Sequence, residues 1–365
     1  MLMLNSESRS IRVIQPGPMT LVQDRGRVGY QQLGVSVSGA IDTDALDIGN
    51  RLVGNEFDAG SLEVMLGGMV IEFSHSTVFA LTGADVSAVL DGVPIAVNVS
   101  YVAHSDSRLE LGIATNGLRS YVAICGGLSV SRVLGSYSTH VASGIGGVEG
   151  RALSEGDVLE IEGLNDASFS GQIFPDGPVL EGSNELEVRV VLGPQDDEFS
   201  AVGIDTLLSY DYTVSDQSNR QGLRLDGPEI ESKTGRYDII SDAVVNGSIQ
   251  VPGDGKPIVL LADRQTIGGY AKIATVVTVD LPSLGQVAPG SKISFTAIST
   301  EDAQDLLAVR VECVENAELS RLVSPRSVWV DGDEVAVGVA ENGVVRLADV
   351  DGITYPISVE KYTPR

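Results

Sequence analysis

The sequence predicts a mainly β protein with some α structure, built from two related domains. Its 365 residues include 42 glycines and 14 prolines, which separate short valine-rich runs. Such frequent turn residues favour many short strands over long helices. Five sequence blocks also occur twice in the same order, once in residues 10–112 and again in residues 185–298. With 43% hydrophobic residues, the chain can bury two or three cores of ordinary domain size.

The repeated blocks define the two related domains. In order, they are I-R-V-I-Q-P-G-P and V-R-V-V-L-G-P-Q, Q-D-R-G-R and S-N-R-Q-G-L-R, G-S-L-E-V and G-S-I-Q-V, F-A-L-T-G-A-D and V-L-L-A-D, and V-A-H-S-D-S-R-L-E-L and V-A-P-G-S-K-I-S-F. The spacing between equivalent blocks varies only by loop-sized amounts, and the unit is longer than a solenoid repeat. We therefore expect two domains of equal topology, with Arg25 and Arg220 at equivalent turns.

The elements of the first half follow in chain order. Residues 41–52 carry apolar side chains at helical spacing, with Asp42 as the expected N-cap and Gly54 as the expected end. Residues 119–127 predict a buried strand that ends at a turn, and residues 156–161 predict another short strand. The stretch 165–184, rich in Pro, Gly, Asp and Ser, is typical of a linker.

These elements divide the chain into three regions. Residues 1–184 form the first domain with an inserted α+β segment at 113–184, residues 185–299 form the second domain, and residues 300–365 form an extension. In the extension, residues 300–322 predict an amphipathic helix, and the final forty residues alternate like strands around a turn at 341–343. The tail has no Met-Lys-Met segment of the kind that carries covalent biotin, so any biotin would arrive on another chain.

The net charge of −26 restricts the partners. Such a chain repels nucleic acid and anionic lipid, so we expect neither as a partner. The acidity itself indicates solubility or a salty habitat and not a function. An anionic small molecule could bind only where Arg, Lys or backbone N–H groups reverse the local field.

Location and redox state follow from two further features. No apolar run approaches the ~20 residues that cross a bilayer, and the first residues lack a basic n-region, so the cytoplasm is the expected location. Cys125 and Cys313 have neither C-x-x-C spacing nor a His cluster nearby. We expect two buried, reduced thiols and no metal site.

General catalytic motifs are mostly missing. The sequence has no G-x-S-x-G, no H-E-x-x-H and no Walker loop, because Pro257 follows the Gly255-Lys256 pair. The Gly-rich stretch 143–151 is either a flexible turn or a backbone nest for an anion. Of the three histidines, His140 is the best candidate for chemistry because it adjoins this stretch.

The segment 260–276, L-L-A-D-R-Q-T-I-G-G-Y-A-K-I-A-T-V, carries the highest density of reactive groups. A short apolar strand leads into a carboxylate, a guanidinium, an amide, a hydroxyl, a phenol and an ammonium, which are costly to bury without partners. A double glycine suggests close approach of a ligand to the backbone. The alternative is a hydrogen-bonded corner in which Asp263 and Arg264 form a simple ion pair. The candidate site residues here are Asp263, Arg264, Gln265, Thr266, Gly268, Gly269, Tyr270 and Lys272.

Three stretches give the chain a specific resemblance. P-G-P-M-T-L-V-Q-D-R-G-R-V-G-Y-Q-Q-L-G-V-S-V-S-G-A-I-D in residues 16–42, A-L-T-G-A-D in residues 80–85 and the segment above resemble the biotin-dependent carboxyltransferase family. That family includes allophanate hydrolase subunit 2-like proteins, the carboxyltransferase part of urea amidolyase, and one of the subunits of bacterial ATP-dependent 5-oxoprolinase. The resemblance runs in order over residues 11–299.

The resemblance implies a pair of cyclophilin-like β-barrel domains that work with a separate subunit of related fold. Two family motifs are altered: S-D-R-M-G becomes Ser218-Asn219-Arg220-Gln221-Gly222, and D-R-Q-T-T-G-G-Y-P-K carries Ile267 and Ala271. Loss of the Asp at position 219 removes a partner for Arg220, which bears on substrate identity more than on fold.

Three functions are compatible with this resemblance. The favoured one is a subunit of an ATP-dependent 5-oxoprolinase, which acts with an allophanate hydrolase subunit 1-like partner and a third amidohydrolase-like subunit. The second is a carboxyltransferase from carboxybiotin to a urea-like acceptor, and the third is a regulatory binding subunit without catalysis. For the first, ATP is the expected cosubstrate, bound here or on the partner.

The same resemblance supplies the residue roles. Asp263, Arg264 and Lys272 are the candidate catalytic residues. The candidate anion- or substrate-binding residues are Arg25, Arg27, Arg220, Gln250, Gln265, Thr266, Gly268, Gly269 and Tyr270.

Overall fold

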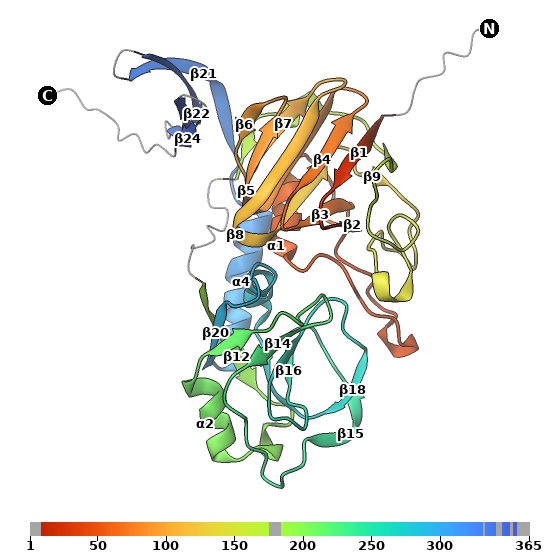
Figure 1. Ribbon diagram of the computed structural model, residues 1–365, viewed down its shortest axis with the longest axis vertical. Helices are drawn as coiled ribbons and strands as arrows, with labels where there is room; N and C mark the ends of the chain where they lie inside the picture. The colour runs from red at the N-terminus through yellow and green to blue at the C-terminus, as the bar shows by residue number, and fades with distance from the viewer. Residues whose placement is uncertain (1–8, 175–183, 331–332, 341–344, 351–352, 356–365) are drawn as a thin grey trace, which may run out of the picture.

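The computed structural model describes residues 9–174, 184–330, 333–340, 345–350 and 353–355. Two β domains lie one above the other along the longest axis of the molecule, and a long helix, α4 (Thr300–Glu315), runs beside both (Figure 1). The prediction of a mainly β protein with some α structure is therefore confirmed.

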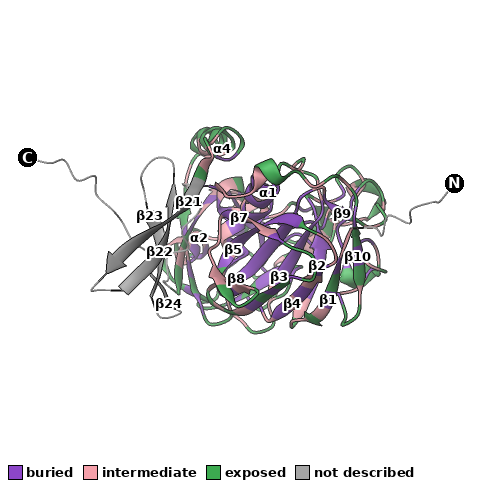
Figure 2. Ribbon diagram, turned by 90° about the horizontal axis from the view of Figure 1, so that it is seen from above, coloured by how far each residue is buried: buried purple, intermediate pink, exposed green. Residues whose placement is uncertain are grey.

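The first domain is organised around a long antiparallel pair, β5 (Thr77–Leu90) and β8 (Arg108–Ile124). In both strands the residues either alternate between buried and more exposed or are buried one after another, as expected for strands at the centre of a core. The other strands that the first domain contributes to this sheet are β1 (Ser10–Pro16), β2 (Met19–Gln23), β3 (Ser61–Met65), β4 (Met69–Phe73), β6 (Val93–Ile95), β7 (Val99–Ala103), β9 (Leu128–Ser129), β10 (Val158–Ile161) and β11 (Gln172–Ile173), and strands of the C-terminal extension continue the sheet beyond β11. Figure 2 shows the inner strands of this domain largely buried.

The expected inserted segment 113–184 begins inside β8. Leu62 of β3 pairs with Val122, and Leu81 of β5 pairs with the same residue from the other side. The first part of the segment is therefore central to the sheet of the first domain, because its backbone is hydrogen-bonded to strands on both edges. Within the expected linker, Ile173 pairs with Val99, and residues 175–183 lie outside the described part of the chain.

The helix expected over residues 41–52 is α1 (Thr43–Leu52). The Asp42 carboxylate accepts the Ala45 N–H at 2.9 Å, which is the expected N-cap bond. Gly54 follows the helix with a φ of +70°, a conformation that favours glycine over other residues. The buried face of α1 packs on β5 and β8, so the helix is fixed to the centre of the first domain.

The second domain is a closed barrel with strand order β12-β19-β16-β17-β14-β13-β20. Ile249, Val259, Ile273 and Phe295 are among the side chains that fill it. The strands are β12 (Glu185–Leu192), β13 (Tyr212–Val214), β14 (Gly222–Asp226), β16 (Ser248–Gln250), β17 (Ile258–Leu260), β19 (Lys272–Val276) and β20 (Lys292–Ala297), with the helices α2 (Ala201–Ser209) and α3 (Leu281–Leu284). A two-stranded ribbon of β15 (Asp238–Ala243) and β18 (Ile267–Tyr270) lies outside the barrel.

The expectation that Arg25 and Arg220 occupy equivalent turns stays a prediction. Arg25 comes directly after β2, whereas Arg220 precedes β14. Arg25 contacts helix α1 through Asp47, and Arg220 is buried between the domains. The two side chains therefore lie in different environments, one on helix α1 and the other at the seam between the domains.

The C-terminal extension differs from expectation in its helix. Helix α4 ends at Glu315 and a strand, β21 (Ser320–Val330), begins before residue 322. Within α4, which the structure describes in full, only Val314 is buried, so hydrophobic burial holds this helix less than its sequence pattern predicts. The expected strands are present as β21, β22 (Asp333–Ala340), β23 (Val345–Val350) and β24 (Ile353–Tyr355), while the turn at 341–343 lies outside the described residues.

Two further expectations concern thiols and membranes. Cys125 is buried as expected, but Cys313 is exposed on α4, because that face of the helix is not covered by the core. Among the described residues, no helix has both the length and the apolar character needed to cross a membrane.

Candidate site between the two domains

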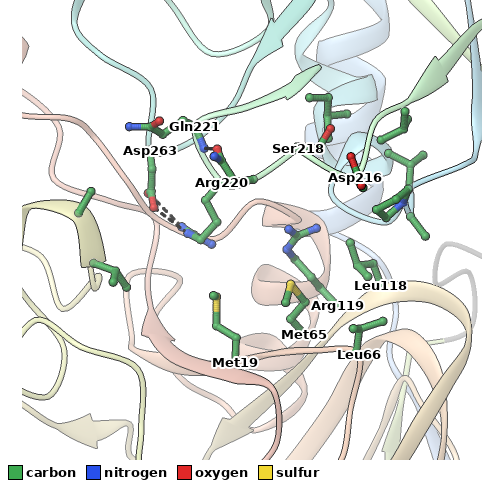
Figure 3. A pocket seen from close by; sticks show the side chains of 18 residues that line it. Met19, Met65, Leu66, Leu118, Arg119, Asp216, Ser218, Arg220, Gln221 and Asp263 are labelled. Atoms are coloured by element: carbon green, nitrogen blue, oxygen red, sulfur yellow. Dashed lines mark hydrogen bonds and ion pairs between the residues drawn. The ribbon is translucent and has the colours of Figure 1, made fainter. Parts of the chain in front are cut away.

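A cavity of about 570 Å³ lies between the two domains. The first domain contributes mainly apolar side chains to it, and the second domain contributes most of the polar groups (Figure 3). It is lined by Met19, Met65, Leu66, Leu118, Arg119, Val141, Ala142, Val214, Asp216, Ser218, Asn219, Arg220, Gln221, Leu223, Asp263, Val287, Ala288 and Pro289. An apolar pocket with a few convergent polar groups is the usual form of a small-molecule site.

Arg220 is the central polar residue of this cavity. Its Nε donates to the Asp263 carboxylate at 2.8 Å, and its Nη2 donates to the Gly39 carbonyl at 2.6 Å. Its Nη1 donates to Glu63 of the first domain. Burial by itself would lower the pKa of Arg220, but the carboxylates of Glu63 and Asp263 raise it above the ordinary arginine value. Arg220 is therefore a permanent cation held in one orientation across the seam.

Glu63 receives donors from several parts of the first domain. The Tyr121 hydroxyl donates to it at 2.7 Å and the Ile41 N–H donates at 3.1 Å, while the Arg119 Nε lies 3.8 Å away. Burial, and then the negative charge of Glu63, raise the pKa of Tyr121 well above its usual range, so this phenol remains a donor.

Arg119 and Gln286 form a second contact between the domains. The backbone N–H groups of Leu118 and Arg119 each donate to Gln286 Oε1 at 2.9 Å, and the Arg119 Nη1 donates to the Gly285 carbonyl. Gln286 Nε2 donates to Asp42 at 2.6 Å. Burial, and then the nearby Asp44, raise the pKa of Asp42 to about 7.

The charges that line the cavity are nearly balanced. The cations Arg119 and Arg220 and the carboxylates Asp216 and Asp263 line it, while Glu63, which is buried outside the lining, pairs with both arginines. Figure 3 shows the two guanidinium ends reaching toward each other above Met19 and Met65. The cavity thus offers directed N–H donors beside an apolar wall, which suits a small ring with polar substituents.

Arg27 and Arg264 lie near this seam without lining the cavity. Arg27 is 1% exposed, and its Nη2 donates to the Ser138 carbonyl. Burial lowers the pKa of Arg27, an effect opposed by Asp24 and Asp263, and burial also lowers the pKa of Arg264. Arg264 has a weak Nη1 contact to the Leu261 carbonyl at 3.5 Å, so the predicted pair of Asp263 with Arg264 is replaced by the pair of Asp263 with Arg220.

Lys272 belongs to a separate group of residues at the ribbon. Its buried ammonium donates to Asp242 of β15 at 3.0 Å, and not to Asp263. Gln250 Nε2 donates to the Tyr270 carbonyl at 3.2 Å, and Gln265 Nε2 donates to Gln250 Oε1 at 3.2 Å. Gln250, Gln265 and Lys272 therefore lie together at the ribbon, whereas Asp263, in the turn that follows β17, faces the seam.

Comparison with known proteins shows which family the chain belongs to. The family model described as carboxyltransferase domain, subdomain A and B, matches residues 33–297. The chain belongs to this carboxyltransferase family. The resemblance drawn from the sequence motifs is therefore confirmed.

Relatives of this carboxyltransferase-family chain are named either for 5-oxoprolinase or for urea amidolyase and urea carboxylase. The chain is 39% identical over 297 residues to a 5-oxoprolinase subunit of Escherichia coli, covering 80% of this chain and 93% of that protein. It is 34% identical to urea amidolyase of Saccharomyces cerevisiae over 87% of this chain, but it spans only 18% of that protein. The solved structure of Kluyveromyces lactis urea carboxylase aligns with a TM-score of 0.80 at 30% identity, covering 91% of this chain and 32% of that one.

The residues expected in the site of this carboxyltransferase-family chain fall into four places. Arg220 and Asp263 line the cavity, while Arg27 and Arg264 are buried beside the seam. The ribbon group contains Lys272, Gln250, Gln265, Tyr270, Gly268 and Gly269, with Thr266, whose carbonyl accepts the Val244 N–H at 3.2 Å, next to it. Arg25 lies apart from the cavity: it donates to Asp47 at 2.7 Å and stacks over Phe57.

Sequence reasoning missed Glu63, Arg119 and Gln286. Glu63 occupies the repeated G-S-L-E-V block and Arg119 begins the buried run, so an inward charge in a predicted strand was the available signal. Gln286 had no such signal, since a single amide in a loop is unremarkable. In the described part of the chain, no three His, Cys, Asp or Glu side chains are grouped to hold a metal ion.

Proposed function

We propose that this chain is a subunit of an ATP-dependent 5-oxoprolinase, which opens the lactam ring of 5-oxoproline to give glutamate. The observation that carries the proposal is the cavity between the domains, with its apolar wall and its two buried arginines. The match to the E. coli 5-oxoprolinase subunit over 93% of that protein supports this activity over urea carboxylation, for which the matched relatives are much longer.

The cavity suits the substrate because 5-oxoproline is a small ring with one apolar edge and two polar groups. The ring methylenes would lie against Met19, Met65 and Leu118. The lactam oxygen and the carboxylate would accept from Arg119 and Arg220, whose N–H groups are held in place by carboxylates of both domains. Asp263, kept close to Arg220, is the carboxylate available to accept a proton from the attacking water.

The lactam is a stable amide, so its opening needs activation. Transfer of the terminal phosphoryl group of ATP to the lactam oxygen releases ADP, and water then adds to the activated carbon. The C–N bond breaks, the nitrogen takes up a proton, and phosphate leaves. We propose that this sequence takes place in a complex with a partner of related fold, allophanate hydrolase subunit 1-like, and with a third amidohydrolase-like subunit.

The second candidate function is transfer of a carboxyl group from carboxybiotin, carried on another chain, to a urea-like acceptor. The structural match to K. lactis urea carboxylase favours it. For that reaction the sequence motif suggests Arg264 and Lys272 for the carboxylate and Asp263 for proton transfer, but Lys272 lies at the ribbon with Asp242 and Asp263 lies at the seam with Arg220.

Co-expression with the neighbouring genes tests both functions. The assembled complex should release ADP with 5-oxoproline and not with urea or without substrate, and the purified chain alone should have little or no turnover. ADP release that depends on urea and on a biotin-carrying partner would favour the second function. Robust 5-oxoproline-dependent hydrolysis of ATP by the isolated chain would contradict its role as a subunit.

A further inference from the structure

Three loops that are far apart in sequence meet behind the wall of the cavity, and Ser38 joins them. The Ser38 N–H donates to the Ala262 carbonyl at 3.0 Å, and its hydroxyl lies 2.7 Å from Asp263 and 3.1 Å from the Thr139 carbonyl. Arg27 is tied to the same place, since its N–H donates to the Val37 carbonyl at 2.8 Å. The junction therefore consists of residues 26–38, 138–147 and 262–264.

Arg27 is buried at this junction with most of its guanidinium unused. Within the described residues, neither its Nε nor its Nη1 has a hydrogen-bond partner, and only its Nη2 donates, to the Ser138 carbonyl. Burying a charged group without partners costs roughly several kcal/mol of folding free energy, unless an anion or an ordered water accepts its hydrogen bonds. Such an unpaired group in a native structure points to a ligand.

The nearby carboxylates do not complete Arg27. Asp24 is occupied by other donors: the Gly26 N–H at 2.7 Å, the Tyr137 N–H at 2.6 Å, and the hydroxyls of Ser136 and Ser138. Asp263 is held by Arg220 and Ser38. Both carboxylates act on Arg27 only through space, so its free N–H groups remain available.

The other two loops at the junction each carry a buried nitrogen without a partner. In the described chain, these are the Nε2 atom of His140 and the Nε atom of Arg264. Asp263, the neighbour of Arg264, and Thr139, the neighbour of His140, both contact Ser38. Each of the three loops that meet at Ser38 thus carries a buried nitrogen without a hydrogen-bond partner.

The Gly-rich loop brings its backbone close to Arg27. Gly146 has a φ of +73°, and a Cβ at that position would lie 2.7 Å from the Arg27 Nη2 and would also overlap the Ser138 carbonyl. Val141 and Ala142 of the same loop line the cavity together with Asp263, so the loop separates Arg27 from the cavity.

We propose that Arg27, at the junction of residues 26–38, 138–147 and 262–264, binds a phosphoryl oxyanion. Two free guanidinium N–H directions beside a glycine backbone suit the tetrahedral oxygens of phosphate. The identification of the ligand as phosphoryl rests on the proposed function, in which a phosphoryl group is transferred and then leaves as phosphate. The site itself rests on the unpaired nitrogens.

Titration calorimetry of the purified full-length chain with inorganic phosphate tests the site, with chloride at equal ionic strength as the reference. Wild type should bind phosphate, and Arg27→Gln should weaken binding at least about ten-fold, because charge-assisted hydrogen bonds to phosphate are lost. Arg25→Gln is the matched control from the same loop: Arg25 pairs with Asp47 outside the junction, so this variant should bind like wild type.

Two additions to this experiment, substitute variants and displacement by ATP, make its outcome decisive. If Arg27→Gln does not fold, Arg27→Lys and Arg264→Gln replace it and should weaken phosphate binding as well. Displacement of phosphate by ATP would assign the phosphoryl group to the nucleotide, and lack of displacement would assign it to free or transferred phosphate. No binding by wild type, equal binding by all variants, or binding of 5-oxoproline in place of phosphate would overturn the proposal. These readouts need no turnover, so their failure is distinct from a failure of ADP release by the assembled complex.

Discussion

Arg220 of the second domain and Glu63 of the first form a buried ion pair across the seam, although 157 residues separate them in sequence. Asp263 binds the same guanidinium from the barrel side. The pair therefore joins the two domains at the cavity that carries the proposed activity.

Replacement of Arg220 tests how much these buried ion pairs stabilise the folded protein. Arg220→Gln leaves Glu63 and Asp263 buried with weaker partners, so the free energy of unfolding should fall by about 3–5 kcal/mol in urea titrations. Lys256→Gln is the control, because Lys256 pairs with Asp226 at an exposed site and should cost at most about 1 kcal/mol. Equal losses in the two variants would contradict a structural role for the buried pair.

Variants of Lys272 and Asp242 show whether the Lys272 ammonium binds an anionic ligand or only forms its ion pair with Asp242 at the ribbon. Lys272→Met retains the apolar stem, and if the ammonium binds an anion, kcat/KM of the assembled enzyme should fall about 10- to 150-fold, equivalent to roughly 1.5–3 kcal/mol. Asp242→Asn removes the ion pair but keeps the ammonium, and it should retain most of the activity. A similar loss in both variants would mean that Lys272 acts only through Asp242.

The Gly-rich loop can be tested with two glycines of similar backbone conformation. Gly146→Ala places a methyl group against the Ser138 carbonyl and Arg27, whereas Gly135, with a φ of +80°, has nothing within 4 Å of the added Cβ. Gly135→Ala should therefore lower stability by only about 1 kcal/mol from backbone strain, and Gly146→Ala by about 3 kcal/mol or more. Thermal unfolding of both variants measures the difference, and equal effects would mean that the loop yields without cost.

Asp42 should make stability depend on pH. Its pKa of about 7 in the folded protein lies above the ordinary value of 3.8, so the folded state holds the proton more tightly than the unfolded chain. Its stabilising contribution is complete below about pH 4 and is lost as the pH rises through 7.

Comparison with Asp42→Asn, which cannot titrate there, isolates this contribution. The unfolding free energy of wild type relative to the variant should fall by a few kcal/mol between about pH 4 and pH 8. Urea titrations at fixed ionic strength measure it. A difference that stays constant over this range would show that Asp42 is not held in its protonated form by the seam.

The sequence by itself determined the mainly β fold class, helix α1 with its Asp42 cap, and the family. Each of these depends on consecutive residues, because strand alternation, turn residues and short motifs are local features of the chain. The same reasoning extended α4 too far and placed Cys313 in the core, because the neighbours that cover a helix face cannot be read from its own sequence.

Tertiary structure alone decided which charges meet. The segment that carries Asp263 and Lys272 looked like one site, but Asp263 lies in a turn after β17 and contacts Arg220 at the seam, whereas Lys272 begins β19 and contacts Asp242 at the ribbon. Glu63 became the partner of Arg220 because two domains pack against each other, and the energy of a buried ion pair depends on that packing rather than on spacing along the chain.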